Sequence, residues 1–310
     1  MQILIYEKNV MKINPVLIKG VIVIVALFGC MKSSNIYYSA ATMNINSKSF
    51  DFIGLEHNRG LDYVFSNTLQ NNNPTFDDVL KSVDKYVYEV SPITSASKDN
   101  RDELFNSETR ALLKSSITSR SIIIDRTTLI KKLTPAQFSM IEKLDGAFSL
   151  SDVELQLSEI KSLKEEAIST LNNEEIVFVL SALSLAEYSL IYWSGSKGEM
   201  WKDRIMEISN SEQGSLKING ENINMNVKSN KIDWHNVAVA DVSAFIVGFP
   251  AGVNVGAIVG GLTAGIASGG VAAGIGAVLG GIVGGTASGI ATAISASAIV
   301  LASEFIVDWF

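Results

Sequence analysis

The sequence predicts an all-α protein: a helical bundle domain followed by a glycine-rich hydrophobic helical hairpin. Apolar residues recur at intervals of three and four through the middle of the chain, which is typical of amphipathic helices. From Val242 to Ser303, 62 consecutive residues carry no charge and hold 15 of the 24 glycines. All 57 charged residues therefore fall in the other 248 positions. The chain therefore has a normally charged helical part and a charge-free, glycine-rich part, and we expect the glycine-rich part to pack closely against itself.

Composition divides the chain into five parts and excludes several classes of protein. The parts are a signal peptide at 1–29 whose start could be Met11, a polar tether at 30–49, the helical domain at 50–206, a linker at 207–240, and a membrane-type glycine-zipper hairpin at 241–310. A single Cys excludes a disulfide framework and a cysteine-based zinc site. A net charge of −7 provides no electrostatic footprint for nucleic acid. We expect no cofactor, no metal and no nucleic-acid partner.

The N-terminal part has the pattern of an export signal. A basic stretch precedes a ten-residue apolar run at 20–29, which is too short to span a bilayer. The run ends at Cys30, and with Leu27 and Gly29 it resembles the lipobox of bacterial lipoproteins. The resemblance implies that Cys30 is lipidated and that the protein is lipid-anchored in the bacterial cell envelope, at the outer membrane or cell surface. Secretion, or an ordinary buried Cys in an apolar segment, is the alternative.

The first half of the helical domain contains three candidate helices. One face of the first consists of Leu61, Val64, Phe65 and Thr68. Thr75 can cap the second, whose inner stripe consists of Phe76, Val79, Leu80, Val83, Val87 and Val90. The third spans 98–118.

Capping signals mark the helices that follow. Thr134-Pro135-Ala-Gln137 is a capping box with Pro at the first helical position, and it predicts a helix to about Phe148. Ser151-Asp-Val-Glu154 predicts a second box. The face behind that box consists of Val153, Leu157, Ile160, Leu163, Ala167 and Leu171. A last helix is predicted from Glu174 to Trp193. Its stretch Ile176–Leu185 is apolar nearly all round, as expected for the buried centre of a bundle.

The linker allows two interpretations. Leu216 and Ile218, and then Ile223, Met225 and Val227, alternate with polar residues around Asn219-Gly220, which is a hairpin signal. A small β-hairpin is therefore one reading of the linker. A flexible Asn-rich segment is the other, because a lone two-stranded hairpin is only marginally stable in water.

Candidate catalytic residues are few. The densest polar cluster is the stretch from Gly54 to Tyr63, where His57 falls on the apolar face of the first helix. His57 could serve as a general base or metal ligand, but no second His is near it in sequence, and a buried structural role is favoured. His235 stands alone in the linker. The aromatic set Tyr188, Tyr192, Trp193 and Trp201 indicates helix-end packing rather than a ligand cage. We therefore predict no catalytic residues and no enzyme activity.

The glycines of the uncharged tail form ladders with a step of four. They are Gly248, Gly252, Gly256 and Gly260; Gly261, Gly265 and Gly269; Gly276, Gly280 and Gly284; and Gly281, Gly285 and Gly289. Such ladders make a smooth ridge on one face of a helix. Fifteen helical glycines cost about 15 kcal/mol relative to alanine, so close helix–helix approach has to offset the loss. These ladder glycines are the predicted helix-packing residues.

Length divides the tail into two helices, near 242–267 and 271–303, because a single helix would be about 93 Å long. Each is long enough to cross a bilayer. Asp241 and Glu304 flank the pair and place both ends on the exported side. We expect a lipid bilayer as partner, together with self-association through the glycine ridge. A hairpin docked on the bundle in soluble form, or an oligomer seam outside any membrane, is the alternative.

The tail also carries a family resemblance. Residues 280–289, Gly-Gly-Ile-Val-Gly-Gly-Thr-Ala-Ser-Gly, are similar to glycine zippers of bacteriocins and small envelope proteins, and a hairpin after a helical domain resembles colicin-type pore formers. Together with 54–63 and 187–193, the arrangement resembles bacterial lipoproteins with a C-terminal glycine-zipper hairpin. The resemblance implies an exported, lipid-anchored envelope protein whose hairpin mediates membrane association or self-assembly. A bacteriocin-like or pore-forming toxin that uses the same hairpin is the alternative.

Overall fold

The structure is a computed structural model that describes residues 45–70, 76–91, 126–210, 216–218, 221–223, 234–249, 285–297 and 300. All of them belong to one compact unit, Ile45–Phe310. The signal peptide, Cys30, the candidate helix at 98–118 and the centre of the glycine-rich tail lie outside the described residues.

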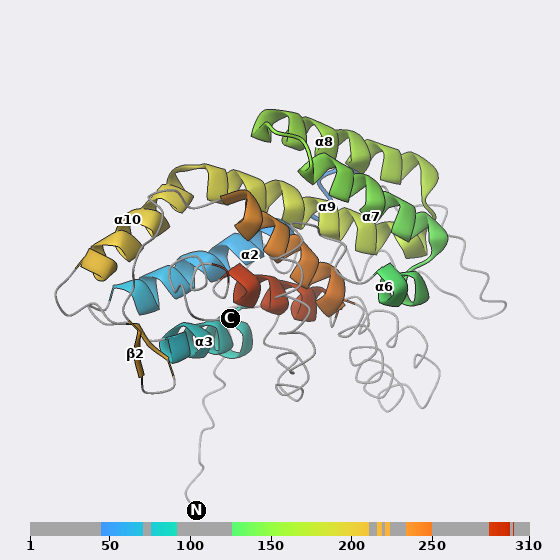
Figure 1. Ribbon diagram of the computed structural model, residues 1–310. Coiled ribbons are helices and arrows are strands. Elements are labelled where there is room, and N and C mark those ends of the chain that lie inside the picture. The colour runs from blue at the N-terminus through green and yellow to red at the C-terminus, as the bar shows by residue number, and fades with distance from the viewer. Residues whose placement is uncertain are drawn as a thin grey trace, which may run out of the picture. The chain divides into compact units, whose positions relative to one another are not determined.

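The predicted all-α class is confirmed. Figure 1 shows the helices in chain order. They are α2 (Asp51–Val64) with the π-helical turn η1 (Phe65–Leu69), α3 (Phe76–Lys85) with the π-helical turn η2 (Tyr86–Val90), α6 (Arg126–Lys132), α7 (Pro135–Phe148), α8 (Val153–Thr170), α9 (Asn173–Ser194) and α10 (Ser196–Asn210). Two further helices, Trp234–Phe249 and 285–297, come from the tail.

Local capping chemistry sets two helix starts. The Thr134 hydroxyl accepts a hydrogen bond from Gln137 N (3.2 Å), and the Gln137 side chain accepts one from Thr134 N (3.0 Å). Pro135 then opens α7, which ends at Phe148, so this capping box is confirmed in full. At α8 the cap is Asp152, whose carboxylate accepts from Leu155 N, and the prediction of Ser151 is wrong by one residue.

α9 is the centre of the helical domain. It packs against α2, α7, α8 and α10 (Figure 1). Among the described residues, its segment Glu175–Ser194 is the one helix apolar and long enough to cross a membrane, and 78% of that window is buried by other parts of the protein. Burial among neighbouring helices accounts for its apolar surface, as the sequence predicts for a central bundle helix.

The buried face of the second predicted helix differs from the prediction near the C-terminal end of the helix. Val83 and Val87 are buried as predicted, whereas Val90 is 45% exposed. The chain passes from α-helix into the π-helical turn η2 at Tyr86. A π-helical turn holds more residues than an α-helical turn, so a face drawn at α-helical spacing drifts off the core after it. The prediction for Val90 is therefore wrong.

A two-stranded antiparallel hairpin follows α10. Its strands are β1 (Leu216–Ile218) and β2 (Glu221–Ile223), and Leu216 pairs with Ile223. Only Asn219-Gly220 lies between the strands, so the hairpin reading of the linker is confirmed. β1 packs against α3, which gives a two-stranded hairpin the tertiary support it lacks alone.

The two tail helices share a core with the helical domain. Residues of Trp234–Phe249 and of 285–297 belong to the same buried hydrophobic cluster as α2 and α9. The first tail helix begins at Trp234 rather than near Val242, so residues 234–240 of the expected linker are helical. In the helix Trp234–Phe249, the apolar surface that could face lipid is instead covered by protein.

The tail helices run antiparallel to each other. Asp241 contacts Ser297, the Ala244 carbonyl accepts a hydrogen bond from Thr292 (2.9 Å), and Gly248 lies against Ser288. As the residue number rises along the first tail helix, the number of its contact partner in the second falls. Phe249 and residue 285 are therefore at the same end of the pair.

Candidate functional site

The polar stretch of α2 joins several helices. Each of its acidic or amide side chains reaches a residue from another part of the chain. Asp51 binds Lys164 (3.1 Å), Glu56 accepts from Tyr86 (2.7 Å) and Ser91 (2.7 Å), Asn58 donates to the Tyr188 carbonyl (3.2 Å), and Asp62 accepts from Lys197 (2.7 Å) and Tyr192 (3.0 Å). The dense polar cluster seen in the sequence is therefore a set of interhelical contacts.

His57 and Asp241 form a buried pair within this site. Both side chains are completely buried, and His57 Nε2 lies 3.4 Å from Asp241 Oδ2. On the other side of the ring, Nδ1 lies 3.1 Å from Asn58 Oδ1. Because Asn58 uses its amide nitrogen on the Tyr188 carbonyl, its oxygen faces His57 and Nδ1 donates to it. If His57 also carried a proton on Nε2, the imidazolium and the Asp241 carboxylate would form an ion pair.

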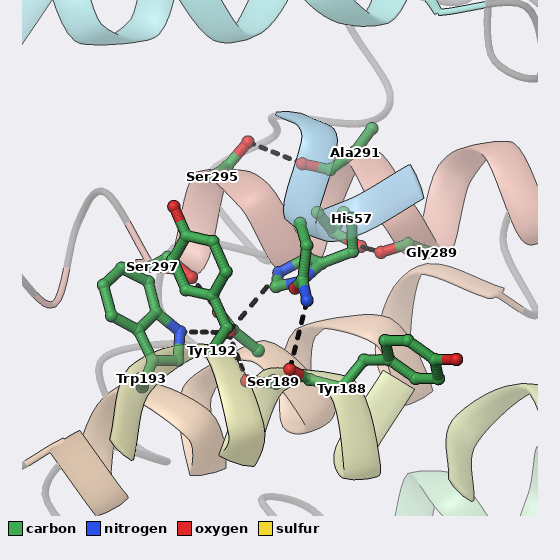
Figure 2. Close-up of polar contacts among 12 residues, drawn as sticks. His57, Tyr188, Ser189, Tyr192, Trp193, Gly289, Ala291, Ser295 and Ser297 are labelled. Atoms are coloured by element: carbon green, nitrogen blue, oxygen red, sulfur yellow. Dashed lines mark hydrogen bonds and ion pairs between the residues drawn. The ribbon is translucent and has the colours of Figure 1, made fainter. Parts of the chain in front are cut away.

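Asp241 accepts hydrogen bonds from three donors on two helices. Ser189 Oγ (2.7 Å) and Trp193 Nε1 (2.8 Å) of α9 donate to Oδ2, and Ser297 Oγ of the second tail helix donates to Oδ1. Figure 2 labels the three donors, Ser189, Trp193 and Ser297, together with His57. Hydrogen bonds from several donors are what a carboxylate needs when it is removed from water. One side chain of the first tail helix thus ties it to α9 and to its antiparallel partner, beside His57 of α2.

The order of groups differs from that of a nucleophilic triad. In a triad the serine hydroxyl bonds to the histidine, and the acid bonds to the far nitrogen of that ring. Here the Ser189 hydroxyl donates to Asp241 directly, and the far nitrogen of His57 donates to Asn58. Within the described ranges, no group of three or more His, Cys, Asp or Glu side chains is arranged to hold a metal ion. As it stands, the arrangement holds helices together.

Close helix approach occurs at two of the ladder glycines. A Cβ atom on Gly289 would lie 2.6 Å from the Phe245 ring, and one on Gly248 would overlap Thr292. Gly285 is buried at the start of the second tail helix. The other ladder glycines, Gly252, Gly256, Gly260, Gly261, Gly265, Gly269, Gly276, Gly280, Gly281 and Gly284, lie outside the described residues. At Gly248 and Gly289, only glycine permits this spacing between the tail helices.

An aromatic cluster covers one end of the site. Trp193 packs edge-on against Tyr192 (5.0 Å between ring centroids), lies 5.7 Å from Trp201 and stacks parallel to Trp234 at 5.4 Å. Trp201 Nε1 donates to the Tyr192 hydroxyl (3.0 Å). Burial raises the pKa of Tyr192 far above its ordinary value, so this hydroxyl stays neutral. Tyr188 is not part of these ring contacts, but the interpretation of the other three residues as helix-end packing is confirmed.

The buried role of Asp241 was not predicted from the sequence. Asp241 was expected to be a flanking charge outside the apolar hairpin, whereas the structure buries it completely inside a helix. The signal was present in the sequence, because apolar residues surround Asp241 on both sides and an acid in such a setting needs partners. His235 also differs from expectation, since it lies in a tail helix against Phe148 and Gln156.

Comparison of the chain with models of known protein families, with characterised proteins and with solved structures finds no match.

Proposed function

We propose that this protein is an exported, lipid-anchored component of the bacterial cell envelope that stores an apolar glycine-rich hairpin against its own helical domain. The hairpin serves membrane association or self-association, and the protein carries out no catalysis. One observation carries the proposal: both ends of the charge-free segment are helices buried in the domain core and held by Asp241.

Docking makes membrane association conditional. A tail helix cannot face lipid while it is covered by α2 and α9, so the hairpin has to leave the domain before it can insert. Withdrawal of the tail helix would separate Asp241 from Ser189 and Trp193, and each buried donor that loses its acceptor costs about 1–3 kcal/mol. Asp241 therefore acts as a retention residue that favours the docked state.

A permeabilising protein is the second candidate, and the same burial favours it. A charge-free segment whose two described helices are covered by protein suits a protein that stays soluble until it reaches a target bilayer. This candidate differs from the first in one measurable respect, because it releases the contents of vesicles and the first does not.

Paired glycine variants test both candidates. Gly289→Ala forces a methyl group against Phe245 and weakens docking, whereas Gly146→Ala in α7 meets nothing within 4 Å. We expect Gly289→Ala to float with anionic phospholipid vesicles more strongly than the wild-type full chain, and Gly146→Ala to match the wild type. Dye release on binding would support the permeabilising candidate. Equal binding by all three proteins would contradict storage of a membrane-active hairpin.

Two cellular variants separate the lipid anchor from the hairpin. Cys30→Ala should abolish acyl labelling and move the protein out of the membrane fraction. Replacing residues 250–284 by a short Gly-Ser linker keeps both docked helices, whose facing ends at Phe249 and 285 can be joined by a short loop. If this second variant stays in the membrane fraction and Cys30→Ala leaves it, lipid is the anchor and the hairpin is stored. Acyl labelling that persists in Cys30→Ala would refute the lipoprotein assignment.

A further inference from the structure

A pocket of about 380 Å³ lies where the α7–α8 connection, the end of α9 and the start of the first tail helix meet. Ten residues line it, among them Phe148, Ser149, Gln156, Ser194, Trp234 and His235. This volume is within the range of small-molecule sites, which are mostly apolar with a few convergent polar groups. The pocket is separate from the His57–Asp241 pair, because neither of those residues lines it.

Gln156 supplies a buried polar atom in the lining that needs a partner. The residue is 3% exposed. Its amide nitrogen donates to the carbonyls of Leu150 (2.6 Å) and Phe148 (3.3 Å), which fixes the orientation of the amide. Its oxygen, Oε1, has no hydrogen-bond partner among the described residues. A buried acceptor without a partner destabilises a protein, so a ligand that brings a hydroxyl or N–H donor to Oε1 would be favoured.

Besides the His235 imidazole and the Trp234 indole N–H, the other polar side chains of the lining are the hydroxyls of Ser149, Ser151 and Ser194. Ser149 and Ser194 donate their protons to backbone carbonyls, so each hydroxyl oxygen can still accept a hydrogen bond from a ligand. None of the ten lining residues is Asp, Glu, Lys or Arg. A pocket without a fixed charge does not compensate the desolvation of a charged ligand, so its chemistry favours a neutral one.

The walls add a flat aromatic surface. Trp234 lines the pocket while it stacks parallel to Trp193, which holds its indole ring in a fixed orientation. Phe148 lies edge-on to His235, with ring centroids 5.7 Å apart. Indole offers an apolar face beside the polar serine and glutamine groups. A ligand that fits both surfaces has an apolar ring face and several hydroxyl groups around its edge.

From this arrangement we infer that the pocket binds a neutral sugar ring. The sugar packs its C–H face on Trp234, donates one hydroxyl proton to Gln156 Oε1, and donates others to the serine oxygens. A plain aromatic ligand would fill the apolar part but would leave Gln156 Oε1 without a partner.

Binding also stabilises the docked tail, because Trp234 and His235 belong to the first tail helix whereas the other lining residues belong to the helical domain. A ligand that binds only the assembled pocket shifts the equilibrium towards the docked state. This effect does not depend on the proposed membrane role, since it is measured without lipid.

Isothermal titration calorimetry and thermal unfolding of the full chain test the inference. The probes are glucose, N-acetylglucosamine and cellobiose as neutral sugars, glucose 6-phosphate as a charged sugar, and indole as an aromatic ligand without hydroxyls. We expect at least one neutral sugar to bind with millimolar or tighter affinity and to raise the unfolding temperature. Glucose 6-phosphate should bind at least tenfold more weakly than glucose.

Variants assign the binding to this pocket. Ser151→Phe places a ring in the exposed mouth of the pocket and should abolish binding, whereas Ser169→Phe at an exposed position of α8 outside the lining should leave it unchanged. Gln156→Met removes the acceptor and should weaken binding about tenfold. Indole binding without sugar binding would overturn the assignment of ligand class. No binding by any probe at 50 mM, or sugar binding that Ser151→Phe leaves intact, would overturn the site itself.

Discussion

Removal of the Asp241 carboxylate should cost a large part of the stability of the fold. In Asp241→Ala three buried donors, Ser189, Trp193 and Ser297, lose their acceptor. The two hydroxyls can turn to other acceptors but the indole N–H cannot, and each buried donor left without a partner costs about 1–3 kcal/mol. We expect a total loss of about 3–5 kcal/mol in the free energy of unfolding.

The isosteric variant Asp241→Asn should be much milder. Its carbonyl oxygen can replace Oδ2 and accept from Ser189 and Trp193, while its amide donates to the Ser297 oxygen, which is able to accept. We expect a loss of about 1–2 kcal/mol, mainly because hydrogen bonds to a charged group are the stronger ones. Asp203→Ala, at an exposed position of α10, is the matched control and should change stability by less than about 0.5 kcal/mol.

Urea unfolding followed by circular dichroism measures all three variants. A double-mutant cycle with His57→Leu then isolates the contribution of the His57–Asp241 pair, which is expected to couple because the two groups lie 3.4 Å apart with no exposure to solvent. An Asp241→Ala protein within about 1 kcal/mol of the wild type would refute the reasoning. An equal loss in Asp241→Asn and Asp241→Ala would also refute it, because the hydrogen bonds that asparagine recovers should make Asp241→Asn the milder change.

Three further expectations follow from packing and charge. Gly289→Ala should lower the free energy of unfolding by about 1–3 kcal/mol through overpacking. Gly146→Ala should raise it by about 0.5–1 kcal/mol, because nothing lies near the added methyl group and alanine favours the helix. Chemical denaturation measures both, and a change of the same sign in the two variants would contradict the close approach at Gly289. Lys164→Met should cost about 3–5 kcal/mol, because it leaves two partly buried carboxylates without their cation, whereas Lys143→Met at an exposed ion pair should cost less than about 1 kcal/mol. Burial raises the pKa of Tyr192 above that of an unfolded tyrosine. The contribution of Tyr192 to stability should therefore be constant up to about pH 10 and fall above it, because the unfolded state loses its proton first. Tyr192→Phe should flatten that fall in alkaline urea titrations, and an unchanged slope would show that Tyr192 does not contribute.

Structure that depends on neighbours in the chain was predictable. The Thr134 capping box, the end of α7 at Phe148 and the hairpin around Asn219-Gly220 each rest on residues a few positions apart. Such contacts form at short loop lengths, so a sequence pattern is enough to identify them. The errors at this level are also local, as at Asp152, which caps α8 in place of its neighbour, and at Val90, which a π-helical turn moves off the core face.

Only part of the candidate site could be predicted from the sequence. The sequence marks His57 as a polar residue on an apolar face and marks the tail glycines as packing residues. It does not place His57 beside Asp241, and it assigns Asp241 to a solvent-facing flank. The local sequence does not distinguish a charged residue at the exposed end of a helix from one that is buried within a helix. The difference depends on which other helices pack against that residue.

The sequence by itself determined that the protein is helical, where its capped helices and its hairpin lie, and that a segment of 62 residues is free of charge and rich in glycine. Only the tertiary structure decided that the ends of this segment are docked in the helical domain around Asp241. The partners of that carboxylate, Ser189, Trp193 and Ser297, are 52, 48 and 56 residues away in sequence. No periodicity within a helix specifies partners at that distance, because they are brought together by burial of apolar surface and by the need of a buried charge for hydrogen-bond donors.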